Sequence, residues 1–179
     1  MASTMSPDEI RNLLEELAVR LDAAGIAVGI RVVGGAAVSI LDNDRRSTSD
    51  IDAVIVPAGA AAEVVAALGT ERGLPANWLN DAALAYVPPV GPEDWIEILR
   101  TGGVSVSIGS VQMLLAMKLL ANRGIRDSAD IEFLLEACNV RSLEDAQTIY
   151  EKYHAQEVIS PSAAARVQHW LEMNQSDES

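Results

Sequence analysis

Two aspartates, Asp50 and Asp52, are the residues of this 179-residue chain whose type and spacing point most directly to chemistry. They lie at the start of the continuous apolar run Ile51–Val56, which predicts a central β-strand covered on both faces. Because side chains alternate along a strand, both carboxylates are expected on one face. Two such groups repel each other, and Mg²⁺ is typically held by one or two carboxylates together with substrate phosphates. The alternative is a solvated loop end in which both aspartates act as caps.

A glycine pair precedes these aspartates, between a predicted strand at 28–33 and a predicted short helix at 36–41. Gly34 and Gly35 have no side chains, so the backbone can approach a ligand closely, and amides at a helix start can face a phosphate. The alternatives are a tight turn or a Rossmann-like loop. The latter is disfavoured because residues 34–39 do not complete the pattern G-x-G-x-x-G.

Arg45 and Arg46 follow in the loop that leads to the aspartates, and arginines there could bind phosphate bidentately. Salt bridges with Asp42 or Asp44 are the alternative. Lys118 interrupts an apolar helix expected from Ser110 to about Asn122. A lysine in that position must either extend its ammonium group to water or meet an anion such as a triphosphate.

We expect Lys118 to face the same cleft as Asp52, so that its replacement by methionine weakens nucleotide binding and leaves folding nearly intact. Asp127 and Asp130 follow near the start of the next predicted helix. Asp127 could cap that helix, with Asp130 in its first turn. Alternatively, one of them orients Lys118 or binds the acceptor of a transfer reaction.

The elements that must position these residues are helices and strands in alternation, followed by helices alone. Ser6 and Glu9 form a capping-box pattern at the start of a helix, and Gly25 is a plausible stop. Further strands are predicted at 95–99 and 104–108, and a further helix at 59–68. Ser110 can cap the helix that holds Lys118, and Ser142 and Pro161 open two more helices. The fold class is α/β (α+β), with a small mixed sheet flanked by helices and a helical C-terminal half. We expect an α/β core at 1–109, a helical part at 110–173 and a disordered tail at 174–179.

Composition narrows the function classes further. The formal net charge of −13 argues against a broad basic surface for nucleic acid. Cys138 is the only cysteine, so no internal disulfide can form, which fits a reducing compartment. Cys138 lies in an apolar helical pattern and is expected in the core. No signal peptide or membrane span is visible, and we expect a cytoplasmic protein.

The combined motifs resemble a known family. Gly34-Gly35 followed by Arg46-x-Thr48-x-Asp50-Ile51-Asp52 resembles the nucleotidyltransferase signature of the polymerase-beta-like superfamily, most closely the AbiEii and MenT toxins. Lys118, followed by Arg126-Asp127 and then Asp130, is similar to the later motifs of those toxins. The resemblance covers roughly residues 28–137.

The resemblance implies a Mg²⁺- or Mn²⁺-dependent transfer of a nucleoside monophosphate from an NTP to an acceptor hydroxyl. The acceptor would be an RNA 3′ end, such as that of a tRNA, or a protein, and an antitoxin could be a partner. Asp50 and Asp52 would bind the metal. The residues implied to bind the nucleotide are Gly34, Gly35, Arg46, Thr48 and Lys118.

Many superfamily members use a third carboxylate on a later strand, and Glu97 in the predicted strand 95–99 is the best candidate here. The catalytic set implied by the resemblance is therefore Asp50, Asp52, Lys118, Asp127, Asp130 and Glu97. The position of Glu97 should separate an enzyme from the alternative, a nucleotide- or protein-binding module without turnover. A Rossmann-like oxidoreductase would need a dinucleotide crevice and an acid after the second strand. Residues 77–81 could line the cleft, or Trp78 could be a core anchor.

Overall fold

The computed structural model describes residues 4–42 and 47–176, and these form two compact units. The first unit comprises Met1–Ala85 with Trp95–Gly109, and the second comprises Tyr86–Asp94 with Ser110–Ser179. The chain therefore passes from one unit to the other three times. No helix within the described ranges is long and apolar enough to cross a membrane.

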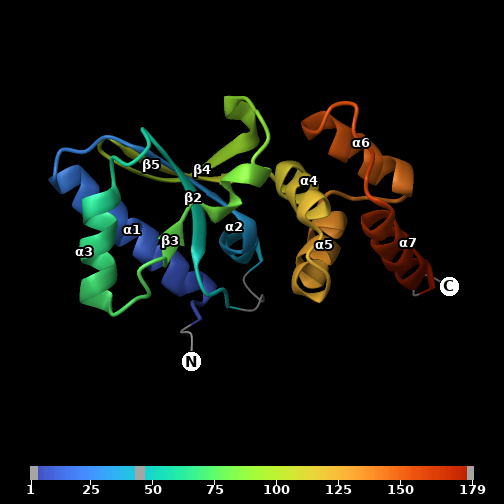
Figure 1. The fold of residues 1–179 in the computed structure, drawn as a ribbon, viewed down its shortest axis with the longest axis horizontal. Helices are drawn as coiled ribbons and strands as arrows, with labels where there is room; N and C mark the ends of the chain where they lie inside the picture. The colour runs from blue at the N-terminus through green and yellow to red at the C-terminus, as the bar shows by residue number, and fades with distance from the viewer. Residues whose placement is uncertain (1–3, 43–46, 177–179) are drawn as a thin grey trace. The chain divides into compact units, whose positions relative to one another are not determined.

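The first unit is a five-stranded mixed sheet with helices packed against it (Figure 1). The strands follow the order β3-β2-β1-β5-β4 across the sheet. β1 pairs antiparallel with β2 and parallel with β5, while β3 is parallel to β2 and β4 is antiparallel to β5. This arrangement confirms the predicted α+β class. The elements are α1 (Pro7–Ala23), β1 (Gly29–Val33), α2 (Gly34–Leu41), β2 (Ile51–Val56), α3 (Ala62–Arg72), β3 (Leu79–Asn80), the 3-10 helix η1 (Ala82–Tyr86), β4 (Trp95–Thr101) and β5 (Val104–Gly109).

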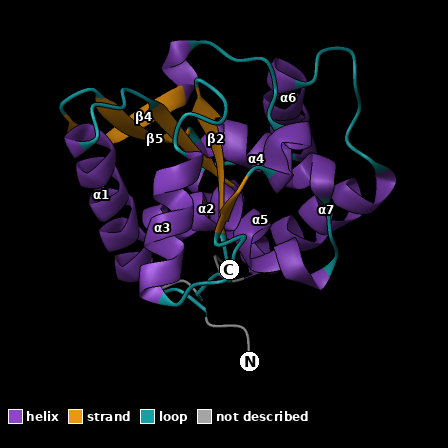
Figure 2. Ribbon diagram, turned by 60° about the vertical axis from the view of Figure 1, so that its left-hand side comes forward, coloured by secondary structure: helices purple, strands orange, loops and turns teal. Residues whose placement is uncertain are grey.

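One face of the sheet carries the core of the first unit. Ile30 and Val32 of β1 are fully buried and lie in register with Val106 and Ile108 of β5. The helix α1 contacts β4 and β5, and α2 contacts β1 and β2, so these two helices cover that face (Figure 2). The hydrophobic effect on this apolar face therefore holds the strands that carry the candidate site.

The expectation that β2 is a central strand covered on both faces is wrong. Its burial alternates, with Ile51 and Ala53 buried while Asp52 and Val54 remain partly exposed. Alternating burial is typical of an antiparallel strand with one face on the core. The neighbour of β2 on one side is β3, which is only two residues long, so β2 lies next to the edge of the sheet.

The N-terminal helix forms where the capping pattern predicted it. Ser6 accepts a hydrogen bond from the Glu9 amide, and the Glu9 carboxylate accepts one from the Ser6 amide at 2.7 Å. The helix ends at Ala23, and Gly25 follows with φ +71°, the left-handed conformation that glycine adopts readily. Local chemistry therefore fixes both ends of α1.

The second unit is helical. It consists of the 3-10 helix η2 (Pro92–Asp94) and four helices, which are α4 (Val111–Ala121), α5 (Ile125–Ala137), α6 (Leu143–Tyr153) and α7 (Pro161–Ser176). Ser110 and Ser142 cap α4 and α6 through their side chains, as the sequence predicted. The helix α7 includes residues 174–176, which the sequence had assigned to a disordered tail, and residues 177–179 lie outside the described ranges.

Candidate functional site

Asp50 and Asp52 flank the first residue of β2, and both are partly exposed. The side chain of Asp50 accepts hydrogen bonds from the Ser49 hydroxyl and from the Asn80 amide, each at 3.2 Å. Asp52 pairs in register with Val33 on one side and with Asn80 on the other. The two carboxylates therefore share one neighbour, Asn80, at the end of the sheet where β1 leads into α2.

Asp50, Asp52 and Asn80 together form what we call the acidic corner. The glycine pair Gly34-Gly35 lies directly against it. Gly34 has φ +64°, and a Cβ added to it would lie 2.8 Å from Oδ2 of Asp52. A Cβ on Gly35 would lie 3.4 Å from the Thr48 hydroxyl, which in turn donates to the Asp50 carbonyl at 3.2 Å. The backbone at the start of α2 thus lies next to the Asp52 carboxylate, because no side chain separates them. Arg46, the remaining nucleotide-binding candidate of this segment, and Arg45 lie outside the described residues.

Glu97 is not brought to the aspartate pair. It lies on β4 at the far edge of the sheet, with β5 and β1 between it and β2. Three strand spacings separate it from β2, a distance of roughly 14 Å. Its carboxylate accepts a hydrogen bond from Arg100 Nε at 3.0 Å. An edge-strand ion pair accounts for Glu97 without any contribution to the site. Its position therefore gives no support to turnover, and the choice between an enzyme and a binding module rests on an assay of transfer.

Lys118 is buried within the second unit, where it forms ion pairs with two aspartates of α5. Its Nζ lies 2.8 Å from Asp127 Oδ1 and 2.7 Å from Asp130 Oδ2. All three side chains are at most 7% exposed. The structure thus brings Lys118 together with Asp127 and Asp130. This is what the interpretation that one of these aspartates orients the lysine required. Lys118 and Asp52 belong to different units, so the expectation that they face one cleft stays a prediction.

Asp127 does not cap α5, because the N-cap of that helix is Gly124. Instead, its carboxylate accepts hydrogen bonds from the Arg123 amide at 2.8 Å and from the Arg123 guanidinium at 3.1 Å. Burial alone would raise the pKa of Asp127, but the hydrogen bonds from Arg123 and Lys118 outweigh it and hold that pKa below its ordinary value. Asp127 is therefore a charged carboxylate at neutral pH.

A model of the family described as nucleotidyltransferase of unknown function (DUF6036) matches residues 7–176. The chain belongs to this nucleotidyltransferase family. No match was found among curated proteins. Membership of the family supports the nucleotidyltransferase superfamily that the motifs indicated. The match spans both units, including residues 138–176, in which the sequence motifs showed nothing specific.

In this family member, the residues at the acidic corner fit a divalent cation. Asp50 and Asp52 are oxygen donors of the kind that Mg²⁺ and Mn²⁺ prefer, and the close backbone of Gly34 leaves the approach to Asp52 free of side-chain carbon. No group of three or more His, Cys, Asp or Glu side chains is placed to hold a metal ion within 4–42 and 47–176. Two carboxylates with phosphate oxygens match the usual way in which proteins bind Mg²⁺.

Asn80 is the residue of this corner to which sequence reasoning gave no role of its own. It lies in β3, a two-residue strand within a loop rich in proline and asparagine, where no periodicity marks a strand. Trp78, two residues before it, is 1% exposed and donates to the Val65 carbonyl at 3.2 Å, which confirms Trp78 as a core anchor. The signal available in the sequence was an asparagine two residues after a tryptophan and directly before Asp81.

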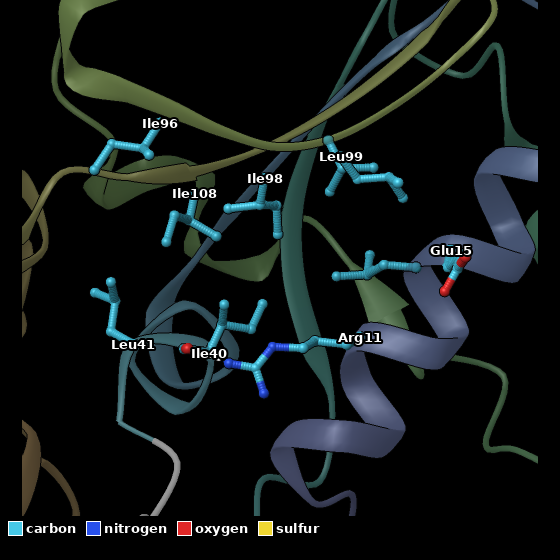
Figure 3. Close-up of a pocket in the computed structure, with 10 residues that line it drawn as sticks. Arg11, Glu15, Ile40, Leu41, Ile96, Ile98, Leu99 and Ile108 are labelled. Atoms are coloured by element: carbon cyan, nitrogen blue, oxygen red, sulfur yellow. Dashed lines mark hydrogen bonds between the residues drawn. The ribbon is translucent and has the colours of Figure 1, made fainter.

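A separate apolar cavity of about 470 Å³ lies on the covered face of the sheet (Figure 3). Ile96 and Ile98 of β4 line one side, and Ile40 of α2 lines another. Arg11 donates to the Ile40 carbonyl at 2.6 Å, and Arg11 and Glu15 are the charged residues of the lining. The carboxylates of Asp50 and Asp52 do not line this cavity, which therefore lies apart from the acidic corner.

Cys138 supports no chemistry of its own. It is the C-cap residue of α5, and burial raises its pKa to about 11. A thiol with that pKa is protonated at neutral pH and is a poor nucleophile.

Proposed function

We propose that this chain transfers a nucleoside monophosphate from an NTP to an acceptor hydroxyl, with Asp50 and Asp52 as the ligands of a divalent cation. The observation that carries the proposal is the close approach of the start of α2 to the Asp52 carboxylate. A Cβ added to Gly34 would lie only 2.8 Å from Asp52 Oδ2. Phosphate-facing amides and metal-binding carboxylates are the two features that such a reaction requires within one corner. The family description agrees with this chemistry.

The residues of the chain would hold the nucleotide rather than react with it. The amides of Gly34 and Gly35 at the N-terminus of α2 would face phosphate oxygens, since that end of a helix favours negative charge. The acceptor hydroxyl would release its proton to solvent as its oxygen forms a bond to the α-phosphorus. The bond from that phosphorus to the bridging oxygen would break, and pyrophosphate would leave. When bound, the divalent cation would neutralise charge on the phosphates and on both carboxylates.

We propose narrower roles for Lys118, Asp127 and Asp130 than those that the resemblance implied. Lys118 already meets two carboxylates, so its charge is compensated before any nucleotide arrives. We propose that this cluster keeps α4 and α5 together. For the acceptor, we propose an RNA 3′ end or a protein hydroxyl held in a local cleft, because a net charge of −13 disfavours an extended RNA surface.

Mg²⁺ and an NTP are expected to stabilise the protein together by more than the sum of their separate effects. The phosphates complete the coordination of the cation, and the cation removes the repulsion between carboxylates and phosphates, so each ligand strengthens binding of the other. Thermal melts without ligand, with Mg²⁺, with each of the four ribonucleoside triphosphates, and with both ligands measure this. The double variant Asp50→Asn with Asp52→Asn should lose the extra shift.

The companion assay mixes the protein with each α-labelled NTP, Mg²⁺ and total RNA, and follows label on RNA and on protein. Loss of an outer partner of a metal ligand weakens metal binding or activity by about 10–100-fold, so loss of the ligands themselves should reduce labelling by more than that. A parent protein without a joint thermal shift would rule the proposal out. A joint shift without any transfer of label would instead favour a nucleotide-binding module.

A further inference from the structure

Asn80 occupies the position beside both carboxylates at which another metal ligand could stand. Its Cα pairs in register with that of Asp52 on the neighbouring parallel strand, and its side chain reaches Asp50 Oδ2 at 3.2 Å. Among the described residues, Asn80 and Ser49 are the two whose side-chain hydrogen bonds to the Asp50 carboxylate are defined. The chemistry of this amide therefore decides how much negative charge the corner carries.

The orientation of the amide follows from its other hydrogen bonds. The Ala82 amide donates to Asn80 Oδ1 at 2.9 Å, so that atom is the acceptor and is turned away from Asp50. Asn80 Nδ2 donates both to Asp50 and to the Asn77 carbonyl, the latter at 3.1 Å. Both polar atoms of the side chain are thus engaged, and the group that faces Asp50 is a hydrogen-bond donor.

A donor facing the carboxylate has two consequences. It holds Asp50 in place from outside, as outer partners of metal ligands do. It also withholds an oxygen from the corner, because an N–H group does not ligate a cation. Among the residues that the structure describes, two carboxylates with one such neighbour suit a single cation, whereas sites for two cations rest on additional bridging oxygen ligands.

We propose that Asn80 is a positioning residue that orients Asp50 and restricts the acidic corner to one divalent cation. This inference rests on the proposed function, since it assigns the number of cations at the same site. Replacing the amide by a carboxylate should convert the corner into a site for two cations, because the Asn80→Asp side chain would present an oxygen beside Asp50 Oδ2.

The test counts bound Mn²⁺ by the electron paramagnetic resonance signal of the free ion, in the presence of α,β-methylene-ATP or α,β-methylene-GTP. The parent should bind one Mn²⁺ per chain and Asn80→Asp should bind two. The count for the variant Asp50→Asn with Asp52→Asn is the background from the acidic surface. Asn77→Asp is the matched control, because it adds the same charge at an exposed position of the same loop and should bind one ion.

Thermal melts give a second readout that does not depend on activity. In EDTA, Asn80→Asp should melt below the parent, because two carboxylates would then face each other across a contact that is 3.2 Å in the parent. Added Mn²⁺ should raise its melting temperature by more than it raises that of the parent or of Asn77→Asp. A merely structural role for Asn80 would lower the melting temperature with and without the ion alike.

The outcomes separate this inference from the proposed function. Two ions in the parent, or any number other than two in Asn80→Asp, would overturn the inference and leave nucleotidyl transfer standing. No ion in the parent would overturn both, because the proposed function also requires one. If Asn80→Asp does not fold, the count for the parent still decides between one cation and two.

Discussion

Replacing Lys118 with methionine is expected to lower the free energy of unfolding by about 3–5 kcal/mol, since removal of one partner from a buried ion pair leaves uncompensated charge in the interior. The lysine is 5% exposed as a residue and compensates both Asp127 and Asp130. This reverses the expectation from sequence that the substitution leaves folding nearly intact. Urea denaturation followed by far-ultraviolet circular dichroism measures the effect.

Two further variants test whether the broken ion pairs cause the loss of stability in Lys118→Met. Lys152→Met removes a lysine whose side chain is 51% exposed, and its effect on stability should be small. The triple variant with Lys118→Met, Asp127→Asn and Asp130→Asn removes the stranded charges as well, and it should be more stable than Lys118→Met alone. If Lys118→Met unfolds at the urea concentration of the parent, the ion pairs are not what stabilises α4 against α5.

Gly34→Ala should have the second large effect, because it combines backbone strain with a clash at a proposed metal ligand. A residue other than glycine at φ +64° is strained by roughly 1–2 kcal/mol. The new Cβ would in addition lie 2.8 Å from Asp52 Oδ2, so the carboxylate or the start of α2 must shift. We expect loss of stability together with loss of the joint Mg²⁺ and NTP shift in melting temperature.

Gly25→Ala is the matched control, because Gly25 has φ +71° and a Cβ there would meet nothing within 4 Å. It should reproduce the loss of stability from backbone strain and leave the joint ligand shift intact. Equal joint shifts in the Gly25→Ala and Gly34→Ala variants would show that the contact between Gly34 and Asp52 has no part in ligand binding.

Local features of the fold were predictable because they depend on neighbours in sequence. The capping box at Ser6, the caps at Ser110 and Ser142, and the strand Ile51–Val56 all involve residues within a few positions of one another. Hydrogen bonds and side-chain periodicity over such short ranges leave clear patterns. The helices and four of the five strands were therefore visible before the structure.

The arrangement of the strands was not predictable in the same way. Glu97 was chosen as the third carboxylate because it is the acid within a predicted strand, but sequence does not say that β5 and β1 separate that strand from β2. The burial of β2 on both faces was inferred from composition, while the alternation follows from its place beside the short β3. Strand order depends on contacts between distant segments, which local periodicity does not record.

The residues of the candidate site likewise divide into those that local sequence patterns predicted and those that only contacts between distant segments reveal. The carboxylate pair and the glycine pair were found from residue types and spacing, and the structure places Gly34 against Asp52. Asn80 was grouped only with residues 77–81 as a possible lining of the cleft. Its contact with Asp50 was not predicted, since that contact spans thirty positions and depends on the pairing of β3 with β2. Lys118 was found as an isolated cation, but only the packing of α4 on α5 shows which charges compensate it.

The place of β5 between β1 and β4 also sets when this protein can begin to fold during synthesis. A nascent chain that has emerged only as far as Gly103 contains β1, β2 and β4, but lacks the strand that joins β4 to the others. Until β5 appears, the apolar residues Ile30 and Val32 have no partner on that side, and such open strand edges promote aggregation. We expect a fragment of residues 1–103 to be digested rapidly by protease while the intact chain resists. A protease-resistant fragment would show that β1 and β2 fold without β5.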